Sequence, residues 1–530
     1  MKDYLKYFPF ESPRKEQKEI LDKTLSAISK GTKFILIEAP TGVGKSAISV
    51  NLGHYLASLN KRSYILTTQK ILQDQYTQDF KNIVSVKGKD NYSCQYYEEL
   101  NCVDSSSLLS KDSEERAQSS HYNTCGNGNC VYRMRKQLFM DAPVSITNLS
   151  YFLHETTYAK ECEFRELLII DECHNLEKEL MSFVDIGLHS YYVKKTFGME
   201  LPDFSTKAYY ITWMIERLLP VMQKSLIKLK RNIMYHKNRN DNDKVISIGK
   251  DIQILDRKIQ NICLFLQKWE PKNWVMNKDK DKSTNSLKIS FKPINVDDFA
   301  AEHVFNFGGT VIMMSATVLN KAIFCKSLGI SESDCEYVNV GSPFPKDNRP
   351  IHFLPVGNMN SKLKKFTLPK MVIAIKEILE SHPDEKGIIH TNSYENARYI
   401  YNGLNNPRLL IHTTKNRDKI LQKHISFPQP TVIITPSMTE GVDLKYELSR
   451  FQILCKIPYP YLMDKQIQFK MKMQPWWYNY ETAKTIIQAL GRSVRTEDDH
   501  AVSYILDSSW SWFYKNNAAL FPEWFREAYN

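Results

Sequence analysis

Short runs of β-branched and other apolar residues alternate with stretches of helical periodicity along most of this chain. Eight such runs form two groups, the first at 34–37, 64–67, 167–170 and 311–314, and the second at 388–390, 432–435, 453–455 and 504–506. Continuous apolar runs of this length are typical of buried parallel strands. A proline-marked stretch at 341–345 separates the groups. The pattern therefore predicts an α/β protein with two parallel-sheet domains.

A long segment between the strands, 181–295, has helical periodicity instead. Apolar residues from Val245 to Trp269 recur at alternating spacings of three and four, which predicts a helix packed along another helix. We expect an antiparallel partner at about 211–229, kinked or broken by Pro220. Two polar stretches inside the segment are predicted loops: 236–243 and 277–282.

A glycine-rich turn follows the first predicted strand and precedes a helical segment. It reads Ala39-Pro40-Thr41-Gly42-Val43-Gly44-Lys45-Ser46, with Ala39 where the generic phosphate-binding pattern has glycine. In this setting backbone N–H groups bind phosphates, Lys45 reaches the β- and γ-phosphates, and Ser46 ligates Mg²⁺. The alternative is an ordinary glycine-rich turn. The turn predicts an ATP and Mg²⁺ site built from Thr41, Gly42, Val43, Gly44, Lys45 and Ser46.

An acidic pair, Asp171 and Glu172, directly follows the predicted strand 167–170. Carboxylates at the carboxyl end of a strand beside a phosphate-binding loop handle Mg²⁺ and the attacking water. We expect Asp171 to hold the metal ion and Glu172 to polarise the water.

Four of the ten cysteines gather in the segment 91–135, which has few apolar runs. They are Cys94, Cys102, Cys125 and Cys130, separated by gaps of 7, 22 and 4 residues. Clustered thiols can hold zinc or an iron–sulphur cluster. The spacing does not decide between these metals, because Cys-x-x-Cys pairs are absent.

Composition and charge narrow the function classes only slightly. Of the 530 residues, 42% are hydrophobic, a fraction that excludes a disordered chain. The 71 Lys and Arg residues exceed the 59 Asp and Glu residues and give a net charge of +12, which is weak evidence for a polyanion partner. Ten cysteines are too sparse for a disulfide scaffold. No window approaches the ~18 apolar residues of a membrane span, and the first residues lack a signal segment. We therefore expect a soluble, intracellular protein with no membrane partner.

Two sets of side chains are candidates for nucleic-acid contact. Seven Lys and Arg residues lie between 224 and 244 and form either a phosphate-binding patch or a solvated helix face. The second set consists of aromatic residues, which either stack on bases or pack in the core. They are Tyr92, Tyr96, Tyr97, Trp476, Trp477 and Tyr478.

Seven short motifs follow one another between residue 14 and residue 495: Arg14-Lys15-Glu16-Gln17, Thr67-Thr68-Gln69, the strand Val144-Ser145-Ile146-Thr147-Asn148, the acidic box Asp171-Glu172-Cys173-His174 with Cys for Ala, Ser315-Ala316-Thr317, Thr439-Glu440-Gly441-Val442-Asp443, and the stretch from Gln488 to Arg495. In content and order they resemble the motifs of the XPD/DinG-type superfamily 2 helicases. The resemblance implies adenine contacts from Arg14 and Gln17, and nucleotide contacts from Gly441 and Asp443. It adds His174, Gln488, Arg492 and Arg495 to the catalytic set. The γ-phosphate also needs positive charge from the side opposite the phosphate-binding turn, and an arginine finger supplies this charge.

The resemblance further implies a fold, cofactors and partners. The fold is α/β, with two RecA-like P-loop domains, an inserted iron–sulphur domain and an inserted helical arch domain. The expected boundaries are 1–90, 136–180 and 296–345 for the first helicase domain, 91–135 for the iron–sulphur domain, 181–295 for the arch and 346–530 for the second helicase domain. Position in the family favours a [4Fe–4S] cluster on the four cysteines, with zinc as the alternative.

The activity implied is an ATP-dependent DNA helicase that moves 5′→3′ on single-stranded DNA, acts on forked duplexes and works as a monomer. One alternative is a translocase that removes R-loops or bound proteins. Another is a binding subunit with a vestigial ATPase, against which the intact catalytic residues argue: Lys45, Asp171, Glu172, Gln488, Arg492 and Arg495.

Overall fold

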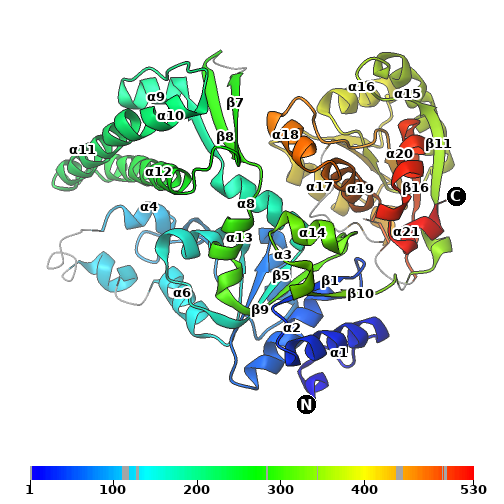
Figure 1. Ribbon diagram of the computed structural model, residues 1–530, viewed down its shortest axis with the longest axis horizontal. Coiled ribbons are helices and arrows are strands. Elements are labelled where there is room, and N and C mark those ends of the chain that lie inside the picture. Colours follow the sequence, from blue (N-terminus) through cyan, green and yellow to red (C-terminus); the bar gives the residue numbers. More distant parts are fainter. Residues whose placement is uncertain are drawn as a thin grey trace.

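The computed structural model describes residues 3–109, 119–126, 130–281, 285–342, 344–436, 444, 446–491, 493–494 and 498–529. Two parallel sheets lie side by side, each covered by helices on both faces, and a helical insertion projects from the first (Figure 1). The N-terminus lies beneath the first sheet and the C-terminus at the outer edge of the second. The α/β fold class predicted from the apolar runs is confirmed.

The first sheet has seven parallel strands in the order β10-β1-β9-β5-β2-β4-β3. The strands are β1 (Phe34–Glu38), β2 (Ser63–Thr67), β3 (Val84–Ser85), β4 (Val144–Asn148), β5 (Arg165–Asp171), β9 (Gly308–Ser315) and β10 (Cys335–Asn339). Alternate residues of each central strand enter two separate cores. One core includes residues of α1 (Lys15–Ser29), α2 (Lys45–Ala57) and α3 (Lys70–Asp79). The other includes residues of α6 (Val131–Asp141), α7 (Leu149–His154), α8 (Leu176–Val184), α13 (Asp297–His303) and α14 (Lys321–Ser327).

The second sheet has six parallel strands in the order β11-β16-β15-β12-β14-β13. They are β11 (Ile351–Gly357), β12 (Gly387–His390), β13 (Leu409–Ile411), β14 (Val432–Thr435), β15 (Phe451–Leu454) and β16 (Val502–Asp507). The core on one face includes α15 (Lys364–Ser381) and α16 (Tyr394–Leu404), and the core on the other includes α19 (Trp477–Leu490), α20 (Ser509–Asn517) and α21 (Glu523–Ala528). A further helix, α17 (Arg417–Ser426), packs beside β13 and β14.

The segment predicted to be helical also contains a three-stranded antiparallel sheet. Its order is β6-β8-β7, formed by β6 (Ile186–His189), β7 (Trp274–Lys280) and β8 (Leu287–Pro293). The prediction of a loop at 277–282 was therefore wrong for residues 277–280, which belong to β7. Trp274 and Val275 are buried at the start of β7, whereas its charged end is an exposed sheet edge, and such edges commonly carry lysine.

The helices of the insertion follow the predicted periodicity. Helix α12 (Asn242–Gln267) spans most of the helix predicted from Val245 to Trp269, and α11 (Leu219–Lys237) packs along it. The insertion also contains α9 (Ser190–Phe197) and α10 (Lys207–Trp213). Pro220 lies in the first turn of α11, just after a π-helical segment, Met214–Leu218. The kink or break expected at this proline is thus a widened π-helical turn through which the helix continues, and this turn accommodates the missing N–H of the proline.

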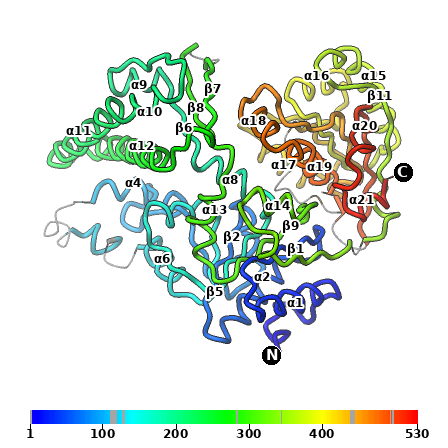
Figure 2. Tube along the Cα trace, in the orientation of Figure 1, coloured from blue at the N-terminus to red at the C-terminus, as the bar shows by residue number. Residues whose placement is uncertain are grey.

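The cysteine-rich segment lies between β3 and β4 and packs beneath the insertion. It includes α4 (Cys102–Ser106) and leads into α6. Figure 2 follows this path, with α4 under α12. Lys250 of α12 and Asp104 of α4 form a 3.1 Å ion pair. From the second domain, α18 (Lys465–Met473) packs against β7, and Lys292 of β8 lies 2.9 Å from Asp464. No described helix is both long and apolar enough to span a bilayer.

Candidate functional site

The glycine-rich turn joins β1 to α2, as its phosphate-binding interpretation requires. Gly42 and Gly44 have φ values of 86° and 85°, which favour glycine, and α2 begins at Lys45. The side-chain amide of Gln17 donates to the carbonyl of Val43 at 2.9 Å, and Arg14 donates to the carbonyl of Gly42 at 2.9 Å. These two predicted adenine-contacting residues therefore also fix the backbone of the turn.

The ammonium group of Lys45 is buried within the turn. It donates to the carbonyls of Ala39 at 3.1 Å and Pro40 at 3.5 Å. Ala39 fits the place of the first glycine because its backbone lies outside the left-handed region and its N–H bonds to Ser315 in the neighbouring strand β9. Ser46 follows Lys45 in the first turn of α2.

Asp171, at the end of β5, is held by a buried tyrosine that the sequence analysis missed. The hydroxyl of Tyr76 donates to Asp171 Oδ2 at 2.8 Å and lies 3.2 Å from Ser49 Oγ, while the backbone N–H of Glu172 donates to the other carboxylate oxygen at 2.9 Å. Burial, followed by the charge of Glu172, raises the pKa of Asp171 to about 6, although Lys45 and Tyr76 act in the opposite direction. The signal for Tyr76 was its place on the buried face of α3, which it shares with Gln73.

Polar contacts link the acidic box to the second domain. His174 Nδ1 lies 3.2 Å from Glu172 Oε2 and 2.8 Å from Ser315 Oγ. Ser315 Oγ lies 3.3 Å from Thr317 Oγ1, which accepts a 3.2 Å hydrogen bond from the side-chain amide of Gln488 on α19. The predicted residues of three separate motifs therefore form one continuous polar chain.

A cavity of about 220 Å³ lies between the two domains beside this chain. The residues lining it include Pro40, Thr41, Glu172, His174, Gln488 and Gly491. The hydroxyl of Thr41 donates to the carbonyl of Gly491 at 3.3 Å, so the glycine-rich turn contacts the second domain directly. Four predicted site residues lie outside the described residues: Gly441, Asp443, Arg492 and Arg495. Gly491 and Val494, which precede the two arginines, both line the cavity.

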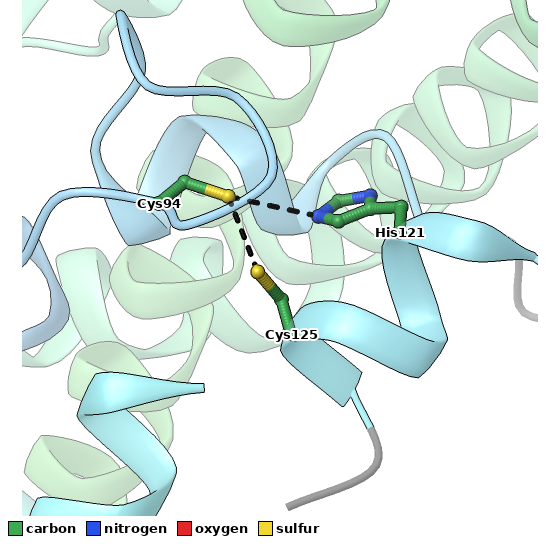
Figure 3. Close-up of side chains that lie close together, drawn as sticks. All are labelled: Cys94, His121 and Cys125. Atoms are coloured by element: carbon green, nitrogen blue, oxygen red, sulfur yellow. Dashed lines mark hydrogen bonds between the residues drawn. The ribbon is translucent and has the colours of Figure 1, made fainter. Parts of the chain in front are cut away.

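The four predicted cysteines approach one another in two pairs. Cys94 Sγ lies 3.5 Å from Cys125 Sγ, and Cys102 Sγ lies 3.9 Å from Cys130 Sγ. His121, which the sequence analysis missed, places Nε2 3.9 Å from Cys94 Sγ (Figure 3). The only hint in the sequence was its position four residues before Cys125. Thiols and imidazole are ligands for zinc, and thiolates ligate iron–sulphur clusters, so the donor set fits a metal centre.

The thiols have different pKa values. Burial raises the pKa of Cys102 to about 12, with the neighbouring Cys130 adding to the effect, and burial also raises the pKa of Cys125. For Cys94, burial is outweighed by hydrogen bonds from Ser105 and from the backbone N–H of Tyr97, which lower the pKa of the thiol below its usual value. Cys94 is therefore the thiol whose surroundings favour the thiolate, the form that binds metal.

Comparisons with known proteins agree with this architecture. Residues 11–201 match the family described as type III restriction enzyme, res subunit, and residues 375–528 match the helicase C-terminal domain. A probable ATP-dependent helicase of Methanocaldococcus jannaschii is 21% identical over 96% of this chain and 93% of its own length. The ATP-dependent DNA helicase YoaA of Escherichia coli is 22% identical over 95% of this chain and 92% of its own.

Solved XPD structures share the fold. An XPD helicase superposes with a TM-score of 0.66 and 15% identity, covering 96% of this chain and 99% of that one. Xpd4 of S. tokodaii gives a TM-score of 0.59 with 16% identity, covering 97% and 99%. In its helicase-domain matches, its relatives and its fold, this chain is similar to the XPD/DinG-like helicases of superfamily 2.

The candidate nucleic-acid residues occupy different environments. Tyr96 is 42% exposed and stacks on His121, whereas Trp477 is buried. Lys224, Lys228 and Lys230 face solvent on α11. Stacking of bases on Tyr96 and binding of phosphates by the lysines stay predictions.

Proposed function

We propose that this chain is an ATP- and Mg²⁺-dependent DNA helicase whose ATP site is completed by both α/β domains. The observation that carries the proposal is the polar chain from Glu172 to Gln488 beside the cavity between the domains. A nucleotide held by one domain and sensed by the other couples hydrolysis to domain movement. The names of the relatives, ATP-dependent helicase and ATP-dependent DNA helicase, support this activity.

The proposed roles follow from position. Lys45 binds the β- and γ-phosphates, Ser46 and Asp171 hold Mg²⁺, and Glu172 orients the attacking water. When bound, Mg²⁺ would neutralise part of the negative charge on the phosphates. Gln488 links the acidic box to α19, so that a change at one is transmitted to the other. Arg492 and Arg495 are proposed to supply positive charge to the γ-phosphate.

The cysteine-rich segment is proposed to hold a [4Fe–4S] cluster on Cys94, Cys102, Cys125 and Cys130, with zinc as the alternative. The approach of the four thiols in two pairs supports a metal centre, and a bound metal would order a segment with little apolar core of its own. Metal analysis of anaerobically purified protein tests the cluster: about four irons per chain are expected.

The proposed substrate is single-stranded DNA at a fork, with 5′→3′ movement by a monomer. The boundaries expected for the inserted domains, 91–135 and 181–295, are part of the same proposal. Displacement of a labelled strand from duplexes with 5′ or 3′ tails tests the polarity: only the 5′-tailed duplex should be unwound.

The ATPase is tested by Lys45→Ala, which removes the ammonium group proposed to contact the β- and γ-phosphates. Hydrolysis of ATP, measured with and without single-stranded DNA, should be lost while DNA binding persists. Lys61→Ala, at an exposed position after α2, is the matched control. Turnover by Lys45→Ala at the wild-type rate would refute the site. Hydrolysis stimulated by DNA without strand displacement would favour the translocase instead.

A further inference from the structure

Three side chains of types that can ligate metal converge in the cysteine-rich segment, and one of them is a histidine. The ligand atoms of Cys94, His121 and Cys125 all lie within 4.8 Å of one another, and all three residues are buried. Figure 3 shows the imidazole Nε2 and the Cys125 thiol both directed at Cys94 Sγ. Such convergence of buried donors is the usual form of a protein metal site.

Two of the distances between these ligand atoms lie within about 0.4 Å of the edges of a tetrahedron around one ion. Bonds of about 2.3 Å from zinc to sulphur and about 2.0–2.1 Å to nitrogen place neighbouring ligands roughly 3.5–3.8 Å apart. The observed separations are 3.5 Å between the two sulphurs and 3.9 Å between Cys94 Sγ and His121 Nε2. In a [4Fe–4S] cluster each cysteine binds its own iron, so ligand sulphurs need not approach so closely.

The surroundings hold the imidazole in place. Tyr96 stacks on the His121 ring with centroids 5.2 Å apart and planes 21° apart, and Tyr97 meets it edge-on at 4.9 Å. The backbone N–H of Tyr97 also donates to Cys94 Sγ at 3.4 Å. Aromatic contacts and an N–H donor to a ligand sulphur are outer contacts of the kind that orient metal ligands.

We propose that Cys94, His121 and Cys125 form a mononuclear site for a borderline-soft divalent ion, Zn²⁺, in chains that carry no cluster. The site shares Cys94 and Cys125 with the proposed cluster, so the two are mutually exclusive, and His121 belongs only to the mononuclear form. A fourth position remains for water or for a thiol of the Cys102–Cys130 pair. The inference does not depend on helicase activity.

The test compares zinc and iron binding in the full chain. Metal is removed with a chelator under reducing conditions, and Zn²⁺ is then titrated in competition with a chromophoric chelator. His121→Ala should weaken zinc binding at least tenfold, His121→Cys should restore it by returning a donor, and His352→Ala, in the second sheet, should match wild type. Reconstitution with iron should be equal in wild type and His121→Ala.

X-ray absorption at the zinc edge gives a second measurement. One imidazole nitrogen and at least two sulphurs are expected around the ion. A shell of four sulphurs, or equal zinc affinity in wild type and His121→Ala, would overturn the proposal. A wild-type chain that binds zinc in this way but takes up no iron would refute the cluster and leave the mononuclear site standing.

Discussion

The side-chain amide of Gln488 donates a 3.2 Å hydrogen bond to the hydroxyl of Thr317, and this bond crosses from the second α/β domain to the first. Ser315 and His174 extend the contact to Glu172. The orientation of the proposed water-activating carboxylate therefore depends on how closely the two domains approach.

Gln488→Leu keeps the size of the side chain and removes the bond. We expect kcat for ATP hydrolysis to fall about tenfold or more, about 1.4 kcal/mol, with little change in ATP affinity, because the phosphate-binding turn is untouched. Thr317→Val should have a similar effect, and the double variant should be no worse than either single one, because both changes remove the same bond. Additive losses would contradict a shared contact.

Tyr76→Phe tests the support of Asp171. The ring keeps its place in the core, but the carboxylate loses its 2.8 Å donor. We expect the Mg²⁺ concentration for half-maximal ATPase to rise roughly 10–100-fold, as for other outer contacts of metal ligands. Tyr55→Phe, on the neighbouring helix α2, is the matched control. An unchanged Mg²⁺ requirement would make Tyr76 a packing residue only.

Arg165→Lys should destabilise the first domain although it preserves the charge. The fully buried guanidinium of Arg165 donates to the carbonyls of Phe139 and Met140 at the end of α6, each at 2.9 Å, and to Ser63 on β2 and Ser145 on β4. An ammonium cannot reach all four acceptors, so we expect a loss of about 2–4 kcal/mol in the free energy of unfolding, measured with urea. The exposed Arg135→Lys on α6 should be neutral, and equal stability of the two variants would disprove the role.

His424 should make the second domain sensitive to acid. Its ring is buried between Thr431 and the carbonyl of Leu448, both at 2.8 Å, and burial lowers its pKa to about 4. The unfolded chain takes up the proton near pH 6.5 but the folded chain does not, so stability falls as the pH drops below 6.5 and the loss is complete below about 4. This amounts to about 2 kcal/mol at pH 5.

His424→Gln removes the titrating group. Urea unfolding at pH 7 and pH 5 should show a smaller loss for the variant than for wild type. Parallel losses in the two proteins would assign the acid sensitivity to other groups.

The chain's apolar runs predict the two parallel sheets, because buried strands have a strong local signature. The strands β6, β7 and β8 escaped prediction because their stability comes from packing against the insertion's helices, and the end of β7 is charged. Motif patterns likewise locate Lys45 and Asp171. Tyr76 was not predicted because it contacts Asp171, 95 residues later in the chain. His121 was not predicted because its contact with Cys94 spans 27 residues, and no spacing rule identifies such pairs.

The position of β1 in its sheet has a consequence for biosynthesis. Phe34 pairs with Val311 on one side and Cys335 on the other, roughly 280 and 300 residues later in the chain. At ~5–20 residues per second, the ribosome needs about 15–60 seconds to supply these neighbours. The nascent strand before the phosphate-binding turn spends that time unpaired, while β2, β4 and β5 can already associate. Ribosome-bound fragments that stop before β9 should therefore be unable to retain ATP and should depend on chaperones.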